Sequence, residues 1–313
     1  MEIINVKNLK KTYTISKMFQ ETKYLNALNG VSFNLNQGET LGIVGESGCG
    51  KSTLAKVLTK LETVTSGEII LANQNFNQIN ESEFHSTIQM VFQDPYQSLN
   101  PRKRAFDIIA DPLYIQGKLS KKEIEDKVLE AMNKVGLRPE MKERYPHQFS
   151  GGQRQRLGIA RSLMLQPKIL ILDEPVSALD VSIQAQVLNL LVDLQKEMNL
   201  SYLFISHDLS VIAHMSDKII VMYLGKIVEY GTRDQIFNDP KHPYTKMLLE
   251  SAPELHKKNA NKIEVVGELP SPFSLPKGCS FSSRCPFKTS KCEEVDVDLT
   301  QQADRYVACL NVN

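Results

Sequence analysis

A glycine-rich loop at residues 45–53 carries the residue types that bind phosphate groups. Its three glycines allow positive φ angles, so successive backbone N–H groups can point at phosphate oxygens. Lys51 supplies a positive charge for the terminal phosphates, and the Ser52 hydroxyl can ligate Mg2+. The residues that we predict to bind the phosphates are Gly45, Glu46, Ser47, Gly48, Cys49, Gly50, Lys51, Ser52 and Thr53.

The sequence on either side of this loop favours a phosphate site over an ordinary glycine-rich turn. Residues 41–44 form an apolar run typical of a buried strand, and residues 54–61 repeat apolar side chains at helical spacing. The loop matches the phosphate-loop pattern at every constrained position, and that pattern requires a strand before the loop and a helix after it. The start of the helix adds the positive end of its dipole.

Two adjacent carboxylates, Asp173 and Glu174, follow another apolar run at residues 169–172. Because side chains alternate along a strand, we expect the two carboxylates to point in different directions. One can hold Mg2+ through water while the other polarises an attacking water molecule. A solvated acidic turn is the alternative interpretation, and it fits poorly after a strand of the kind covered on both faces.

Gln93 and His207 also follow apolar runs, at residues 88–92 and 202–205. Ligands in open α/β sheets gather at the carboxyl ends of strands. We therefore expect Gln93 to reach a metal ion or a water molecule at such a site, and His207 to act at a strand end as well. An ordinary polar loop residue and a packed or solvated histidine are the alternative interpretations.

The run Ser150, Gly151, Gly152 and Gln153 predicts a second anion-binding helix start. Ser150 is a typical helix N-cap, and the two glycines leave the first-turn amides exposed. The chain therefore has two helix starts suited to phosphate, of which only the first carries a lysine. A head-to-tail pair of subunits would give the second helix start a phosphate to bind.

Residues 3–15 alternate loosely between apolar and polar side chains, which predicts an edge strand. Tyr13 either packs within this strand or offers an aromatic face to adenine, and the sequence leaves both interpretations open. Residues 66–72 predict a further strand, so the early strands suggest an antiparallel layer. Apolar spacing then predicts a helical region at residues 106–136, a hairpin at 218–231 and short helices within 232–252.

The composition limits the class of protein. The chain has 313 residues, with 37 Lys and Arg against 36 Asp and Glu, a formal charge of +1. That balance does not favour nucleic acid. No run approaches the roughly 18 apolar residues of a membrane span, and the N-terminus lacks the apolar core of a signal peptide. We expect a cytosolic α/β protein with one large domain and a smaller appendage.

Four cysteines, Cys279, Cys285, Cys292 and Cys309, lie near the C-terminal end. In a reducing compartment they indicate a metal site before disulfides. Their spacing fits neither the close pairs of a zinc ribbon nor a common ferredoxin run, so the spacing leaves the metal open. A segment this short and rich in proline and glycine cannot bury much core, which also favours a stabilising metal.

Taken together, the motifs resemble the nucleotide-binding subunit of ATP-binding cassette (ABC) transporters over nearly the whole chain. The phosphate loop is shared by many NTPases, whereas the Ser-Gly-Gly-Gln run before the strand that ends in two carboxylates is far more specific. Phe149 departs from the leucine that many cassettes have before this run, and both residues are apolar. The runs that further resemble the dipeptide-type ATPase of dipeptide and oligopeptide importers are residues 92–102, 174–180, 242–244 and the four C-terminal cysteines.

The resemblance implies a fold and a domain organisation. It implies an α/β ABC ATPase domain at residues 1–254, with a parallel core sheet, an antiparallel β layer and a helical signature subdomain at about residues 96–165. A small C-terminal extension that carries the cysteines would occupy residues 255–313. In this extension, the resemblance moves a 4Fe-4S cluster ahead of zinc, with the cysteines holding Phe281, Phe287 and Tyr306 against the cassette.

The resemblance also implies roles for the candidate residues and names ATP and Mg2+ as cofactors. Tyr13 would stack on adenine, and Ser52 and Gln93 would reach Mg2+. Asp173 would support the metal, and Glu174 would be the general base. The residues that complete this set are His207, which would contact the γ-phosphate, and Ser150, Gly151, Gly152, Gln153 and Asp180, which would act in trans on ATP held by a partner.

The partners implied are a second ABC ATPase, two transmembrane permease subunits and, indirectly, a peptide-binding protein, with this chain peripheral at the cytoplasmic face of the membrane. The segment after Gln93 through about Gly117 would touch a permease. Import of another small solute such as nickel is an alternative. An ATP-driven clamp on nucleic acid or ribosomes is less favoured, because the chain has no long heptad repeat and only one cassette.

Overall fold

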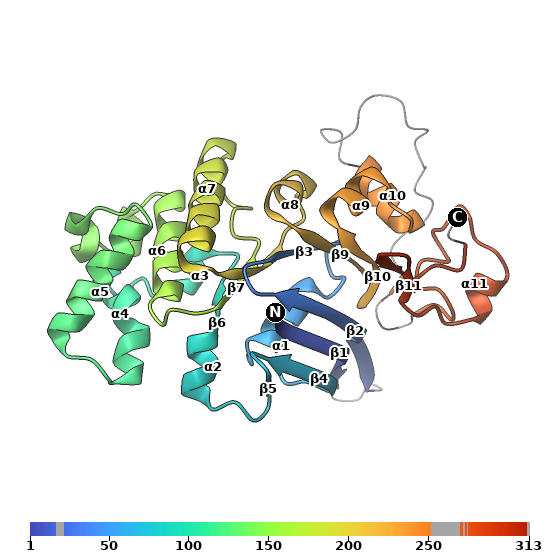
Figure 1. The fold of residues 1–313 in the computed structure, drawn as a ribbon, viewed down its shortest axis with the longest axis horizontal. Coiled ribbons are helices and arrows are strands. Elements are labelled where there is room, and N and C mark those ends of the chain that lie inside the picture. The colour runs from blue at the N-terminus through green and yellow to red at the C-terminus, as the bar shows by residue number, and fades with distance from the viewer. Residues whose placement is uncertain (17–21, 252–269, 272, 274, 312–313) are drawn as a thin grey trace. The chain divides into compact units, whose positions relative to one another are not determined.

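The computed structural model describes residues 1–16, 22–251, 270–271, 273 and 275–311 (Figure 1). The chain divides into two compact units. The first comprises Met1–Ile3, Leu35–Glu39 and Ala72–Ile205, and the second comprises Ile4–Asn34, Thr40–Leu71 and Ser206–Asn313. The predicted domain boundary at residues 254 and 255 lies outside the described residues and stays a prediction.

Three parallel strands form the sheet of the first unit. They are β6 (Ile88–Val91), β7 (Ile169–Asp173) and β8 (Ser201–Ile205), with β7 in the middle. All five residues of β7 and of β8 are buried, as their continuous apolar runs predict. The register pairs Asp173 with Ile205, so the carboxyl ends of β7 and β8 lie next to each other.

Apart from the short strand β5, the other elements of the first unit are helices, and α4, α5 and α6 pack side by side (Figure 1). No strand interrupts the described residues between α3 and α6, which fits the helical segment predicted at residues 96–165. Gly117 adopts a left-handed conformation that divides the predicted helical region into α4 and α5. The bounds are β5 (Gln74–Asn75), α2 (Glu81–Thr87), α3 (Pro95–Ser98), α4 (Ala105–Gln116), α5 (Lys121–Lys134), η1 (Pro139–Glu143), η2 (Pro146–Gln148), α6 (Gly151–Leu163) and α7 (Val181–Met198).

The second unit holds the strand that leads into the phosphate loop. Strand β3 (Thr40–Val44) is fully buried and pairs in parallel with β9 (Lys218–Tyr223). The predicted hairpin is confirmed, because β9 turns through Leu224 and Gly225 into β10 (Lys226–Thr232). Strand β10 pairs with β12 (Arg305–Val307), and β12 pairs with β11 (Thr300–Gln302), so the C-terminal hairpin extends this sheet.

An antiparallel layer is also present in the second unit. Strand β1 (Glu2–Ile15) lies between β2 (Lys23–Asn36) and β4 (Ser66–Leu71). The prediction that residues 3–15 form an edge strand is therefore wrong, because a strand covers each side of β1. The remaining helices are α1 (Lys51–Leu58), α8 (Leu209–Met215), α9 (Arg233–Asn238), α10 (Pro243–Glu250) and α11 (Lys291–Glu294).

The predicted α/β class is confirmed by the parallel strands, the antiparallel layer and the helical segment. None of the helices in the described part of the chain is long and apolar enough to cross a membrane. In the C-terminal extension, Phe281 is buried as expected, whereas Phe287 is 54% exposed. Tyr306 stacks on Tyr230 of β10 with 5.8 Å between ring centroids, although its outer side remains accessible.

Candidate functional site

The phosphate loop begins where β3 ends, and its shape depends on glycine. Gly45 has φ 150°, and a Cβ atom there would lie 2.2 Å from the carbonyl oxygen of Met222 in β9. Gly50 has φ 109° and caps α1, and a Cβ atom there would lie 2.4 Å from the carbonyl oxygen of Ala27. Side chains at these positions would clash with backbone, so the loop can lie this close to its neighbours only with glycine.

Lys51 is buried, with 7% of its surface exposed, and its ammonium group turns back onto the loop. The Nζ atom donates to the carbonyl oxygens of Gly45 at 2.7 Å and Glu46 at 3.1 Å. This places a positive charge within the ring of loop backbone, as the sequence predicts. The Ser52 side chain is exposed, one residue into α1. That position suits a hydroxyl that binds a metal ion beside phosphate.

Cys49 contributes packing to the loop. It is buried, and burial raises the pKa of its thiol. Its carbonyl oxygen accepts a hydrogen bond of 2.9 Å from the N–H of Gly225, at the turn of the β9–β10 hairpin. The hairpin turn therefore supports the phosphate loop from outside.

Glu46 makes two contacts that sequence reasoning missed. Its N–H donates to the Tyr244 hydroxyl at 2.9 Å. Its carboxylate accepts two hydrogen bonds from Arg284, at 2.9 and 3.1 Å. These hydrogen bonds raise the pKa of the Arg284 guanidinium above its ordinary value. No local signal predicts these contacts, because Glu46 and Arg284 are 238 positions apart in the chain.

Tyr13 lies near the end of β1 and is half-buried. The ammonium group of Lys11 lies 4.7 Å from the centre of its ring, and Lys11 also pairs with Glu62 at 2.9 Å. The cation lies within the distance at which an ammonium group is attracted to the face of an aromatic ring. Stacking of Tyr13 on adenine stays a prediction.

The structure brings Gln93 and Glu174 together, although 81 positions separate them. The side-chain Nε2 of Gln93 donates to the Glu174 carboxylate at 2.8 Å. The Oε1 oxygen of the same amide is an acceptor of the kind that can bind Mg2+. The roles of Gln93 as a metal ligand and of Glu174 as the general base stay predictions.

Asp173 and Glu174 lie in different surroundings, but the alternation of side chains along a strand is not the reason. Strand β7 ends at Asp173, which is buried. Glu174 follows the strand with φ 47°, a left-handed conformation that is uncommon for glutamate, and its N–H donates to Ile205 at 2.9 Å. This turn of the backbone sets the direction of the Glu174 carboxylate. Such strain is typical of functional positions.

The second predicted helix start has the expected form. Ser150 caps α6 with its hydroxyl oxygen, which accepts from the Gln153 N–H at 3.3 Å, while the Gln153 side chain accepts from the Ser150 N–H at 3.1 Å. Ser150 is exposed, and its hydroxyl hydrogen can still donate to an anion.

The glycines of this helix start pack against the segment that carries Asp180. A Cβ atom on Gly151 would lie 3.2 Å from Leu179, and one on Gly152 would lie 2.4 Å from Ile183. Asp180 is exposed and begins α7. The structure therefore brings together the residues that we predict to act on ATP held by a partner, and their action in trans stays a prediction.

His207 is exposed and follows β8 as predicted. It belongs to the unit that contains the phosphate loop, whereas Gln93, Asp173 and Glu174 belong to the other unit. The combination of these groups in one catalytic site is therefore a prediction from the family resemblance.

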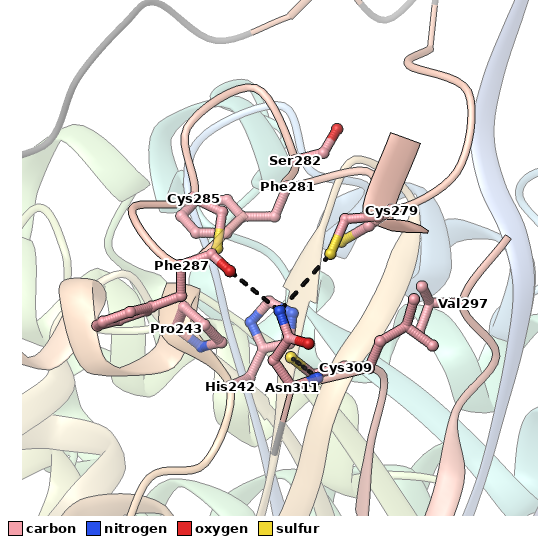
Figure 2. Close-up of a pocket in the computed structure, with 12 residues that line it drawn as sticks. His242, Pro243, Cys279, Phe281, Ser282, Cys285, Phe287, Val297, Cys309 and Asn311 are labelled. Atoms are coloured by element: carbon pink, nitrogen blue, oxygen red, sulfur yellow. Dashed lines mark hydrogen bonds between the residues drawn. The ribbon is translucent and has the colours of Figure 1, made fainter. Parts of the chain in front are cut away.

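The four C-terminal cysteines line a single pocket (Figure 2). Apolar side chains form much of its wall, among them Phe281, Phe287 and Val297. None of the four is in a disulfide. Cys279 and Cys309, the outermost of the four cysteines, are 30 positions apart in the sequence. The fold brings all four to one pocket.

Hydrogen-bond donors point at each of the four sulfur atoms. The N–H groups of the residues two positions further along donate to Cys279, Cys285 and Cys309. The Cys292 sulfur lies 3.3 Å from the Thr289 hydroxyl and accepts from the Asn311 amide at 3.8 Å. Burial nevertheless raises the pKa of Cys279, Cys285 and Cys309. Hydrogen-bond donors of this kind stabilise sulfur atoms that carry negative charge. A positively charged group beside them would offset the cost of burying that charge.

The described structure does not arrange these four thiols around one metal ion. Within the described residues, no group of three or more His, Cys, Asp or Glu side chains is arranged to hold a single metal ion. The four iron atoms of a 4Fe-4S cluster lie apart from one another, and each takes one cysteine. A 4Fe-4S cluster on these cysteines stays a prediction.

Two families match the chain. Residues 28–177 match the family described as ABC transporter. Residues 228–292 match the family described as oligopeptide/dipeptide transporter, C-terminal region. The dipeptide transport ATP-binding protein DppF of Haemophilus influenzae is 52% identical over 99% of this chain and 97% of its own length. The chain belongs to the ABC transporter ATP-binding proteins of the dipeptide and oligopeptide branch.

Other members of the branch are similarly close. DppF of Escherichia coli is 51% identical over 98% of this chain and 93% of its own length. The oligopeptide transport ATP-binding protein AppF of Bacillus subtilis is 49% identical over 98% of this chain and 96% of its own length. A solved dimeric post-hydrolysis state of the ATP-binding cassette MJ0796, bound to ADP and Pi, covers 74% of this chain and 98% of its own, with 31% identity and a TM-score of 0.64. The predicted fold and family are therefore confirmed.

Proposed function

We propose that this chain hydrolyses ATP to energise the import of dipeptides and oligopeptides through membrane permeases. The observation that carries the proposal is its similarity, over nearly its whole length, to ATP-binding proteins of dipeptide transport. The named relatives include both dipeptide and oligopeptide transport proteins, and the C-terminal match is to the same branch. A nickel importer or an ATP-driven clamp would have no need to resemble peptide-transport proteins in both its ATPase domain and its C-terminal region.

The loop geometry supports ATP as the ligand. The loop at residues 45–53 binds the phosphates through backbone N–H groups other than that of Glu46, which donates to Tyr244, and through Lys51, which exchanges the Gly45 and Glu46 carbonyl oxygens for phosphate oxygens. Mg2+ takes oxygen ligands, and the Ser52 hydroxyl and the Gln93 side chain can provide two of them. Tyr13 stacks on the adenine ring.

The chemical step belongs to Glu174 and its neighbours. Glu174 accepts a proton from the attacking water molecule, and Gln93 holds its carboxylate at 2.8 Å. Asp173 supports the metal ion from its buried position, and His207 contacts the γ-phosphate. The metal neutralises charge that develops on the phosphate oxygens when it is bound.

A second ATPase subunit completes the site. Ser150, Gly151, Gly152 and Gln153 contact the γ-phosphate of ATP held by that partner, and Asp180 lies beside them. The similar cassette MJ0796 is described as a dimer with ADP and Pi, which supports this arrangement. The partner here is a related ATPase, so the pair is a heterodimer that ATP closes and hydrolysis opens.

The remaining partners follow from the transport function. Two permease subunits form the path through the membrane, and a peptide-binding protein delivers the substrate to them. This chain then sits as a peripheral subunit at the cytoplasmic face, where the segment from Asp94 to Gly117 contacts a permease. Nucleic acid has no part in this function.

The C-terminal cysteines hold one 4Fe-4S cluster in a structural role. Cys279, Cys285, Cys292 and Cys309 would supply the four thiolates, and a cluster bound there would link the segments that carry them. The N–H and side-chain donors around the sulfur atoms support this assignment. Transport itself needs no electron transfer.

The test is transport by the assembled importer. The chain would be reconstituted in vesicles with its sister ATPase, both permeases and the binding protein, and uptake of a labelled dipeptide would be measured with ATP inside. We expect uptake that depends on ATP and stops with Lys51→Ala in this chain. Uptake of Ni2+ in place of peptide, or ATP hydrolysis that never responds to peptide, would overturn the proposal.

A further inference from the structure

We propose that Arg284, in the cysteine-bearing extension, is a positioning residue for ATP binding. It holds the carboxylate of Glu46 and so links the affinity of the phosphate loop to the folding of the extension around its cysteines. This inference rests on the proposed binding of ATP by residues 45–53.

The contact between the two residues is close and sheltered. Two nitrogen atoms of the Arg284 guanidinium lie 2.9 and 3.1 Å from the two carboxylate oxygens of Glu46. The Arg284 side chain is 7% exposed and the Glu46 side chain 24% exposed. A bidentate pair with this geometry is directional as well as attractive, unlike an exposed surface ion pair.

Tyr244 of α10, whose ring packs against Phe281 of the extension, holds the backbone at Glu46. The Glu46 N–H donates to the Tyr244 hydroxyl at 2.9 Å. The Tyr244 ring packs against Tyr223 and Phe281, at centroid distances of 4.6 and 5.5 Å. Arg284 in turn lies 3.5 Å from the Tyr223 hydroxyl. Main chain and side chain of one loop residue are therefore fixed by the C-terminal part of the protein.

Charge gives this contact its effect on nucleotide. Glu46 follows Gly45, and the carbonyl oxygens of both residues accept from Lys51. An unpaired carboxylate at this position would repel a polyphosphate and attract the lysine that should bind it. Arg284 neutralises that carboxylate and draws it away from the loop interior. Partial burial limits screening by salt, so the effect persists at physiological ionic strength.

The contact reaches the cysteines through the chain itself. Arg284 immediately precedes Cys285, and its N–H donates to the Phe281 carbonyl oxygen at 3.0 Å. Phe281 and Cys285 both line the cysteine pocket (Figure 2). Any change that releases the Cys285 loop therefore also moves Arg284 away from Glu46.

The experiment measures the dissociation constant of ATP with Mg2+ on the purified full chain. We expect Arg284→Met to weaken binding by about tenfold, because it leaves the Glu46 carboxylate unpaired. The double variant Arg284→Met with Glu46→Gln should recover most of the affinity, since the repelling charge is gone. Arg284→Lys should retain part of it. Lys288→Met is the matched control, because Lys288 pairs with Glu293 in the exposed part of the same extension.

Several outcomes separate the possibilities. If the double variant binds ATP as weakly as Arg284→Met, the effect comes from disrupted folding and the inference is wrong. An unchanged dissociation constant in Arg284→Met would also overturn it. Cys285→Ser should weaken ATP binding in the same direction, and wild-type affinity there would overturn the link to the cysteines. A wild-type chain that binds no ATP would instead contradict the proposed function.

Discussion

Glu174 combines a strained backbone with a defined hydrogen-bond partner. Its φ of 47° is costly for a residue with a Cβ atom, and the hydrogen bond from Gln93 holds its carboxylate at 2.8 Å. Preorganisation of this kind lets a general base meet a water molecule without moving when the reaction occurs. Proton abstraction from water requires an oxygen that can accept a proton. The negative charge of the Glu174 carboxylate should therefore matter more than the shape of the side chain.

We therefore expect Glu174→Gln to slow ATP hydrolysis by roughly 10^2 to 10^4, the range for loss of a general base, while ATP binding is retained. The amide keeps the size of the side chain and can still pair with Gln93. Steady-state ATPase activity and nucleotide affinity of the reconstituted transporter check this. Glu197→Gln is the control, since Glu197 is exposed and pairs with Lys134. Wild-type turnover in Glu174→Gln would exclude it as the base.

Lys51→Ala should act at an earlier step. The variant removes the positive charge that the terminal phosphates require, so we expect loss of nucleotide binding itself. Equilibrium binding of ATP with Mg2+ to the full chain measures this. An unchanged dissociation constant would show that the loop does not bind the phosphates through Lys51.

At the level of elements, the connection from β3 to α1 sets the path of the phosphate loop. Gly45 lies against the backbone of β9, whereas a Cβ atom on Gly48 would meet no atom within 4 Å. Both glycines have positive φ angles, of 150° and 80°. A comparison of substitutions at the two positions therefore distinguishes the effect of close packing, present at Gly45, from that of a positive φ angle alone, at Gly48.

We expect Gly45→Ala to destabilise the protein by about 2 kcal/mol or more and to abolish nucleotide binding, because the added methyl group overlaps the Met222 carbonyl oxygen. Gly48→Ala should cost only about 1 kcal/mol, the penalty for a left-handed alanine. Urea unfolding midpoints measure the difference. Equal losses in the two variants would mean that conformation, and not the contact with β9, fixes the loop.

We predict that the start of α6 acts on a different molecule of ATP, held by a partner subunit. We expect Ser150→Arg in this chain to reduce ATP hydrolysis by the assembled transporter strongly, since a bulky cation replaces the small N-cap beside two glycines. The purified chain alone should hydrolyse ATP slowly, and addition of the sister ATPase and permeases should raise the rate. Intact activity of the assembled Ser150→Arg transporter would contradict the trans role.

At the level of the whole molecule, the C-terminal extension joins the second unit by an added hairpin and a buried ring. Strand β12 pairs with β10, and Phe281 packs against Tyr223 and Tyr244. These contacts tie the cysteine pocket to the sheet that carries the phosphate loop. We propose that a cluster on the four cysteines further stabilises this short segment.

We expect protein purified without oxygen to contain about four iron and four acid-labile sulfide per chain, as a cluster on four cysteine thiolates requires. Cys285→Ser should lose most of the iron, because it removes one ligand. Metal analysis and sulfide assay measure both. The matched control is Cys49→Ser, a buried cysteine outside the cluster, which should keep its iron. Stoichiometric zinc without iron, or no metal in fully folded protein, would overturn the assignment.

The sequence by itself determined the features that depend on neighbouring residues. The glycine spacing and Lys51 define the phosphate loop within one short segment, and apolar runs place polar residues at the ends of β6, β7 and β8. The N-cap at Ser150 is local as well, because its hydrogen bonds reach only three residues along the chain. Local physics was sufficient in these cases, and similarity to a family supplied the roles.

Only the tertiary structure decided contacts between distant segments. The pairing of Gln93 with Glu174 spans 81 positions and that of Arg284 with Glu46 spans 238. The sequence places Glu46 in the phosphate loop but does not identify Arg284 as its partner, because the packing of Tyr223, Tyr244 and Phe281 brings the two together. The interior place of β1 was likewise decided by pairing with β2 and β4. Hydrogen bonds and strand pairs depend on which surfaces meet after folding, and one segment's residue pattern does not name its partner.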